Sequence, residues 1–196
     1  MNPLFAPGRR VVAAWSFLAL SAVTFTAVLA PVTTVRAADP ATFSVGAFTF
    51  KRPSTWTWVP VSSSMRKAQL RIANPADPAS SPADVVFFHF GAGQGGSVDS
   101  NISRWLGQFD EKDRDKLKPI IETAEVKGTK ITRVRVSSGT FSSGMPGGPT
   151  TPMTNYGLYG AIIESAQGDV YVKMTGPTDL VNAATPNFEA MVQSPF

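Results

Sequence analysis

Residues 84–90, Asp84-Val-Val-Phe-Phe-His-Phe90, and the two segments that follow them decide the fold class of this chain. A continuous apolar run of this length is typical of a strand in the middle of a sheet. Gly91-Ala-Gly-Gln-Gly-Gly96 ends the strand, and Ser97 supplies a hydroxyl that can cap the first amides of a helix. Helical spacing of i, i+3, i+4 and i+7 then predicts one buried face, formed by Ile102, Trp105, Leu106 and Phe109.

Alternating apolar residues predict further strands on both sides of this unit, at residues 42–51, 68–73, 130–136, 156–164 and 169–175. Ala166-Gln-Gly168 separates the last two, which indicates a hairpin. Residues 142–152 are rich in glycine and proline and are expected to form an irregular connection. Thr178 is expected to cap a final helix that Pro186 kinks or restarts. This order predicts an α+β fold with a mainly antiparallel β-sheet packed by helices.

Residues 1–37 have the organisation of an export signal peptide. Arg9 and Arg10 precede an almost wholly apolar run at residues 11–32, and Val35-Arg-Ala37 offers small residues to a signal peptidase. We therefore expect residues 38–196 to form a single mature domain in the periplasm or outside the cell. The apolar run is also long enough to span a bilayer, so an uncleaved N-terminal membrane anchor is the alternative. Membrane contact is expected only through this signal or anchor.

The charge of the expected mature domain argues against nucleic acid as a partner. The whole chain carries a formal net charge of +4, to which Arg9, Arg10 and Arg36 contribute without any acid in the same segment. Without them, 15 basic residues face 14 acidic ones. Proteins that bind nucleic acid concentrate basic residues on one surface to displace counterions, and no such stripe is visible in the sequence.

Several catalytic and metal-binding chemistries are excluded or disfavoured by composition. Cysteine is absent, which excludes disulfides, thiolate metal sites and thiol nucleophiles. His89 is the only histidine, and we interpret it as a packing or hydrogen-bonding residue. No acidic loop has calcium-ligand spacing. We expect no metal and no cofactor. Trp56 and Trp58, which stand at i and i+2, are interpreted as core residues rather than as a stacking surface.

The glycine-rich segment after the first central strand is the candidate binding site. It satisfies G-x-G-x-x-G between a strand and a helix, but a dinucleotide site also needs a second strand that ends in an acid about 20 residues later. That position falls in the charged run at residues 110–115 with no strand before it. A tight structural turn is the favoured interpretation. The alternative is an anion or small-ligand site, whose candidate residues are Gly91, Gly93, Gly95, Gly96, Ser97, Asn101 and Arg104.

Three segments resemble the PsbP-like proteins: Phe48-Thr-Phe-Lys-Arg-Pro-Ser-Thr-Trp56, Tyr171-Val-Lys-Met-Thr-Gly-Pro177 and the closing stretch at residues 188–194. The resemblance implies an α/β/α sandwich, as in extrinsic photosystem proteins and a Ran-binding import factor. Residues 65–109 further resemble exported bacterial proteins of unknown function. The extended N-terminal segment and metal-binding histidines that would suggest a photosystem role are not present, so the resemblance implies the fold more than an activity.

Two hypotheses of function follow from these observations. The first is an exported non-catalytic domain that acts as a binding or accessory module for an envelope protein or a small ligand. The second is a small periplasmic enzyme, or an anion- or nucleotide-binding protein, that uses the turn at residues 91–96. Composition favours the first hypothesis, because no catalytic constellation is visible.

The mass of the exported protein tests the expected cleavage. Because residues 1–37 serve the membrane rather than the core, we expect the protein recovered from the periplasm or medium to begin at Ala38. Mass spectrometry of that fraction checks this. A full-length mass in the soluble fraction would contradict the signal peptide, and a full-length mass in the membrane fraction would support the anchor.

Overall fold

The computed structural model describes residues 39–61, 63–143 and 151–196. The signal segment expected at residues 1–37 lies outside the described residues. Within the described parts, all neighbouring strands of the main sheet pair antiparallel. The seven strands follow in the spatial order β3 (Thr57–Trp58), β4 (Arg66–Ile72), β5 (Ala83–His89), β9 (Val170–Pro177), β8 (Thr151–Ile163), β7 (Thr129–Ser143) and β6 (Ile120–Val126).

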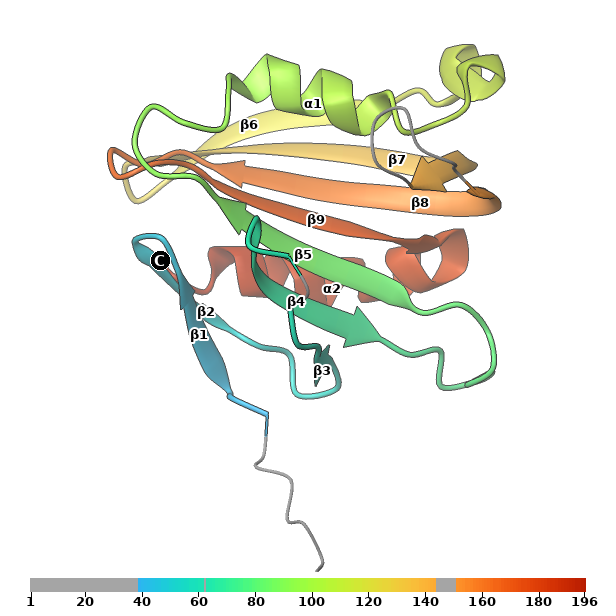
Figure 1. The fold of residues 1–196 in the computed structure, drawn as a ribbon, viewed down its shortest axis with the longest axis horizontal. Helices are drawn as coiled ribbons and strands as arrows, with labels where there is room; N and C mark the ends of the chain where they lie inside the picture. Colours follow the sequence, from blue (N-terminus) through green and yellow to red (C-terminus); the bar gives the residue numbers. More distant parts are fainter. Residues whose placement is uncertain (1–38, 62, 144–150) are drawn as a thin grey trace, which may run out of the picture. The chain divides into compact units, whose positions relative to one another are not determined.

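Helices pack on both faces of this sheet (Figure 1). Helix α2 (Thr178–Gln193) and the hairpin of β1 (Thr42–Val45) and β2 (Phe48–Lys51) cover one face. Helix α1 (Val98–Leu106) lies on the other, and a short 3₁₀ helix, η1 (Glu111–Lys116), follows it. Two separate clusters of buried apolar side chains fill the two interfaces. The expected α+β class, with a mainly antiparallel sheet packed by helices, is confirmed.

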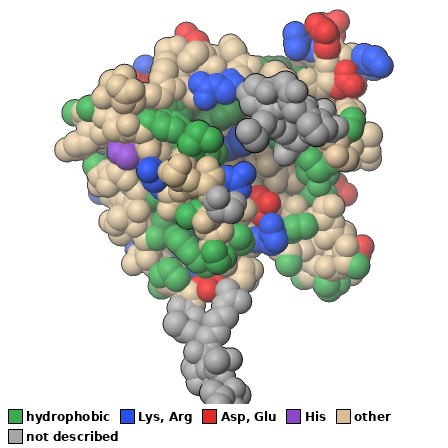
Figure 2. Space-filling view, in the orientation of Figure 1, with side chains coloured by type: hydrophobic (Ala, Val, Ile, Leu, Met, Phe, Trp, Pro, Cys, Tyr) green, Lys and Arg blue, Asp and Glu red, His purple; other side chains and the backbone are tan. Residues whose placement is uncertain are grey.

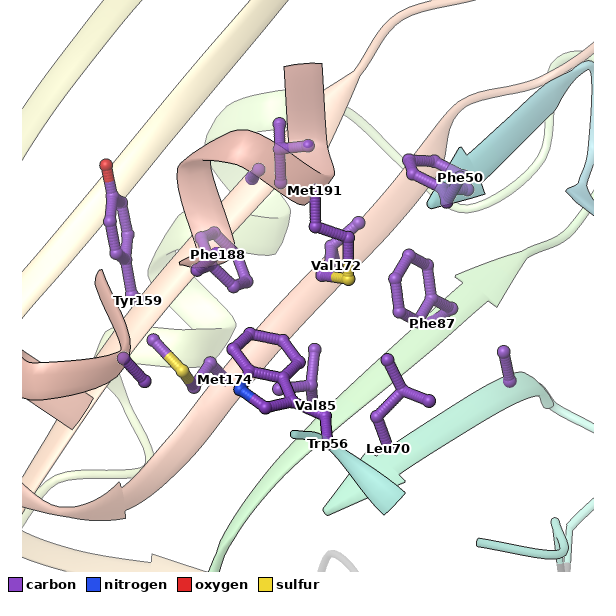
Figure 3. Packing of buried hydrophobic residues seen from close by; sticks show 14 of the residues in the cluster. Phe50, Trp56, Leu70, Val85, Phe87, Tyr159, Val172, Met174, Phe188 and Met191 are labelled. Carbon is purple, nitrogen blue, oxygen red and sulfur yellow. The ribbon is translucent and has the colours of Figure 1, made fainter. Parts of the chain in front are cut away.

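The larger core lies between the sheet and α2. Side chains from β5 and β9 that point to this face meet Phe188 and Met191 of the helix, and Phe50 of β2 stacks edge-on against Phe87 (Figure 3). Trp56, which precedes β3, is almost completely buried in the same cluster. Successive strand residues point to opposite faces, so Val170, Val172 and Met174 fill this core while Tyr171 and Lys173 point toward α1.

Helix α1 is anchored to the sheet through Trp105. Ser97 caps the helix as expected, with its side chain accepting the amide of Ser100 at 3.2 Å. Ile102 and Trp105 are buried, and the Trp105 ring lies directly on Gly160 of β8: a Cβ at that glycine would come within 2.3 Å of the ring. The missing side chain therefore lets the indole reach the sheet backbone. The predicted helix is confirmed, and Ile102 and Trp105 are buried as expected. Leu106 is only partly buried, and Phe109 is buried beyond the end of the helix, where it pairs with Phe141.

Two segments differ from the sequence-based expectations. Residues 42–51 form a hairpin rather than the single strand that the sequence predicted, because Gly46 takes a positive φ of 56° and reverses the chain. Residues 142–143 and 151–152, expected in an irregular connection, belong to β7 and β8; the rest of that connection, 144–150, lies outside the described residues.

Two further elements were predicted incorrectly. Strand β6 was not predicted at all, because it is an edge strand whose side chains are almost all exposed and which therefore lacks an apolar alternation. Thr178 does not cap α2: it is the first helical residue, and its hydroxyl is buried without a hydrogen-bond partner among the described residues. Pro186 lies inside α2 without ending the helix.

The anchoring role of Trp105 can be tested by substitution. Because the side chain is only 5% exposed, Trp105→Ala should lower the free energy of unfolding by about 3 to 5 kcal/mol, the usual cost of removing a large buried aromatic ring. Leu106→Ala, at a less buried position of the same helix, is the control and should cost less. Chemical denaturation of both variants measures the difference; equal stability of Trp105→Ala and the wild type would contradict the anchor.

Candidate functional site

The candidate site is a groove on the α1 face of the sheet. The buried strand residues packed beneath α1 come from β7, β8 and β9, so the helix leaves much of the neighbouring surface of β4 and β5 open. A cavity of about 900 Å³ lies there, with its floor on β4, β5 and β9 and one wall on α1. Figure 2 shows hydrophobic and basic side chains gathered on this face of the molecule.

Strand register explains why a particular set of side chains meets in the groove. Val86 of β5 pairs with Lys173 of β9. Two residues further along β5, Phe88 pairs with Arg66 of β4 on one side and with Tyr171 of β9 on the other. These residues share one face because strand side chains alternate with a period of two. Arg104 of α1 lines the same cavity. Three basic side chains from three different elements, Arg66, Arg104 and Lys173, thus converge; we call them the basic triad.

Lys173 occupies the most unusual electrostatic position in the groove. Its ammonium donates a hydrogen bond to Oε1 of Gln108 at 2.7 Å and lies 5.9 Å from the centre of the Phe141 ring. Burial lowers the pKa of Lys173 to about 8, and the positive charges of Arg66 and Arg104 contribute to the shift. The amine is therefore held where its charge is disfavoured, and near neutral pH it is still mostly protonated.

Acidic residues do not balance the basic triad. Four of the residues that line the cavity are basic and one, Asp84, is acidic. Asp84 is already paired with Arg71, at 3.0 Å from the guanidinium. Arg66 donates to the neutral side chain of Gln69 at 2.7 Å. Within the described residues, no carboxylate forms an ion pair with any member of the basic triad. The groove consequently carries an excess of positive charge next to apolar surface.

The sequence-predicted site residues separate into two groups in the structure. Asn101 and Arg104 line the groove, whereas Gly91, Gly93, Gly95, Gly96 and Ser97 form the adjacent turn and do not line it. Asn101 is largely engaged in holding the turn, since its amide donates to the carbonyls of Gly95 and Ser97, both at 2.9 Å. Arg104 is therefore the predicted residue whose charge reaches the groove.

The glycine-rich turn is tightly packed on its neighbours. The Tyr171 hydroxyl donates to the carbonyl of Gly96 at 3.3 Å and lies where a side chain at Gly95 would have to go. Gly91, Gly93, Gly95 and Gly96 all have positive φ, a conformation that glycine adopts without strain. These contacts support the interpretation as a structural turn, which places α1 and Arg104 beside the sheet.

His89 and the paired tryptophans lie away from the groove. Nδ1 of His89 is 3.2 Å from the carbonyl oxygen of Asp169, and the ring packs over Gly46, where a Cβ would come within 3.0 Å. This agrees with a packing and hydrogen-bonding role. Trp56 is a core residue as predicted, and Trp58 is partly buried, with its ring edge-on to Phe43 at 5.4 Å.

Arg66 and Lys173 were missed by sequence reasoning. The sequence did contain a signal for Lys173. Residues 170–174, Val-Tyr-Val-Lys-Met, place a lysine in an otherwise apolar strand, on the face opposite to that of Val170, Val172 and Met174. A charge at such a position marks a face that is not simple core. Arg66 gave no such signal, because it follows a polar segment and only the register of β4 on β5 brings it over Phe88.

The described parts of the chain offer neither a cluster of metal ligands nor a membrane-spanning helix. No group of three or more His, Cys, Asp or Glu side chains is placed to hold a metal ion among these residues. No helix there is long and apolar enough to cross a membrane.

Comparison with known proteins gives structural likeness only. No protein-family model and no curated protein match the chain. Among solved structures, it is similar to cyanobacterial PsbP (CyanoP) from Synechocystis sp. PCC 6803, with a TM-score of 0.49, 10% identity, and coverage of 85% of this chain and 96% of that one. It is also similar to a protein of unknown function from Pseudomonas aeruginosa, with a TM-score of 0.38, 11% identity, and coverage of 78% and 93%. The PsbP-like resemblance noted in the sequence thus recurs among solved structures, and at these identities it concerns the fold alone.

The pKa of Lys173 leads to a prediction about stability. The unfolded chain keeps the lysine proton up to its ordinary pKa of 10.5, whereas the folded protein loses it near pH 8. Between these values the unfolded state binds more protons, so the contribution of Lys173 to folding stability rises with pH. Lys173→Met removes this contribution, and its stability relative to the wild type should fall from pH 8 to 10.5. Urea unfolding across that range measures it; parallel pH profiles would contradict the shifted pKa.

Proposed function

We propose that the protein is an exported, non-catalytic binding module whose groove holds a small anionic ligand. The observation that carries the proposal is the basic triad: a largely buried lysine lies close to two arginines, and no acid among the described residues pairs with any of the three. Lys173 is the most buried of the three, whereas Arg66 is partly buried and Arg104 is exposed. A buried cation is normally paired, because an unpaired charge in an apolar environment is costly. An anion in the groove would supply the missing partner.

The chemistry of the triad suits an oxyanion such as a carboxylate, sulfonate or phosphate. Two guanidinium groups and one ammonium offer several charge-assisted hydrogen bonds, which are shorter and stronger than neutral ones. A bound anion would also offset the repulsion among the three cations. Gln108 holds the Lys173 ammonium from the α1 side at 2.7 Å, so this member of the triad is oriented before a ligand enters.

Export is part of the proposal and is supported by the sequence of residues 1–37. The basic start, the apolar run and the small residues at positions 35–37 suit a secreted or periplasmic protein, with retention by an uncleaved anchor as the alternative. The non-catalytic assignment is supported by the polar groups of the groove. These are mainly cations, amides and hydroxyls, and Asp84 is engaged by Arg71.

Calorimetric titration of the purified protein with benzoate at pH 7 and low salt tests the proposal. We expect binding that weakens as salt screens the charges and also as pH rises above 8, where Lys173 loses its proton. Arg104→Gln and Lys173→Met should each weaken binding by roughly tenfold, a typical effect of losing one charge-assisted hydrogen bond.

The matched control is Arg114→Gln, which removes one positive charge from the exposed pair with Glu111 outside the groove. It should leave benzoate binding unchanged. Equal weakening by Arg114→Gln and Arg104→Gln would show a general charge effect and contradict the site. Absence of measurable benzoate binding to the wild type at millimolar concentration would also contradict it.

A further inference from the structure

We propose that the ligand is an amphiphilic anion, in which one charged head group is attached to an apolar body. This inference rests on the proposed function, because the basic triad is taken to bind the head group. It adds that the apolar walls of the groove bind the rest of the molecule. The size of the groove is the first reason: about 900 Å³ is near the upper end of the range of roughly 300 to 1,000 Å³ for small-molecule sites and far exceeds an inorganic anion.

The second reason is an exposed apolar wall at the end of the groove near the start of α1. The rings of Phe88 and Phe90 are nearly parallel with their centres 6.4 Å apart, and Phe90 meets Tyr171 at 6.0 Å. Phe90 is 40% exposed, and Met65 beside the same cavity is 61% exposed. Large apolar side chains grouped at one exposed site mark a binding surface more often than isolated ones do. Methionine also adapts its shape to different partners.

The third reason is a second apolar wall toward the opposite end of the groove. Phe141 and Tyr156 stack with an interplanar angle of 9° and a centre-to-centre distance of 6.2 Å, and Met153 lines the cavity with them. The pairing of β9 with its neighbours shows the order of the two walls and the basic triad along the groove. Tyr171 stands beside Phe88, Lys173 follows two residues later, and Pro177 stands beside Tyr156. Lys173 therefore lies along β9 between the two apolar walls.

This arrangement discriminates between ligand classes. A small inorganic anion would pair with the basic triad but would leave the exposed Phe90 and Met65 and the partly exposed Tyr156 and Met153 in contact with water. A neutral apolar molecule would cover the walls but would take water away from the cations without pairing them, which costs free energy. A molecule with both parts satisfies both surfaces at once. Either a flat ring system or an acyl chain meets this requirement, so the experiment includes one probe of each kind.

The test compares four probes by calorimetry on the purified protein at pH 7: acetate, 1-naphthoate, decanoate below its micelle concentration, and the neutral alcohol 1-naphthalenemethanol. At least one of the two large anions should bind at least roughly tenfold more tightly than acetate, since it buries apolar surface that acetate lacks. The neutral alcohol should bind at least roughly tenfold more weakly than 1-naphthoate.

Substitutions in the apolar wall near the start of α1 test whether that wall causes the tighter binding of the large anion. Phe90→Ser and Met65→Ser should weaken binding of the tighter large anion while leaving acetate unchanged. Ile121→Ser is the matched control, because Ile121 is 50% exposed on the edge strand β6, far along the sheet from the groove. It should change neither.

The outcomes separate this inference from the proposed function. Acetate binding as tightly as both large anions would overturn the amphiphile and leave the anion site standing. Equal binding of the neutral alcohol and 1-naphthoate would overturn the inference, because the head group would then contribute nothing. Failure of every anion to bind would overturn the proposed function and this inference together.

Discussion

The contact of Trp105 with Gly160 determines where the groove can form. A side chain at Gly160 would collide with the indole, so its absence lets α1 lie low over β8. One short helix cannot cover a seven-stranded sheet, and its position over β7, β8 and β9 leaves much of β4 and β5 open on that face. The same position brings Arg104 and Gln108 toward Lys173. Packing in one half of the sheet therefore creates the electrostatic site in the other half.

The two faces of the sheet serve different purposes in this account. The α2 face is a continuous core, to which the β1–β2 hairpin adds Val45 and Phe50. The opposite face is a core only beneath α1, and beside it the strands carry charged side chains next to apolar ones such as Val86 and Phe88. β9 contributes Val172 to the first face and Lys173 to the second. A lysine whose pKa is lowered by burial and by like charges reduces stability near neutral pH, and such a cost is typical of functional positions rather than of structural ones.

Local sequence patterns predicted most of the fold but only one charged residue of the site. The capped helix at Ser97, its buried face at Ile102 and Trp105, and the central strand before it all leave signals within a few residues. Strand β6 left none, because an exposed edge strand has no buried side to alternate with. Arg104 was recognised because it lies beside the glycine-rich turn. Arg66 could not be associated with Lys173, because 107 positions separate them along the chain and only the pairing of β4, β5 and β9 brings them together.

The central claim is that the groove, rather than the glycine-rich turn, binds anions. Mapping of backbone amide shifts by NMR during titration of the isotope-labelled protein with benzoate tests it most directly. The account predicts that the largest changes cluster at residues 86–88 of β5, 171–173 of β9 and 104–108 around the end of α1. Changes confined to residues 91–97, or scattered over exposed lysines such as Lys67 and Lys112, would contradict it.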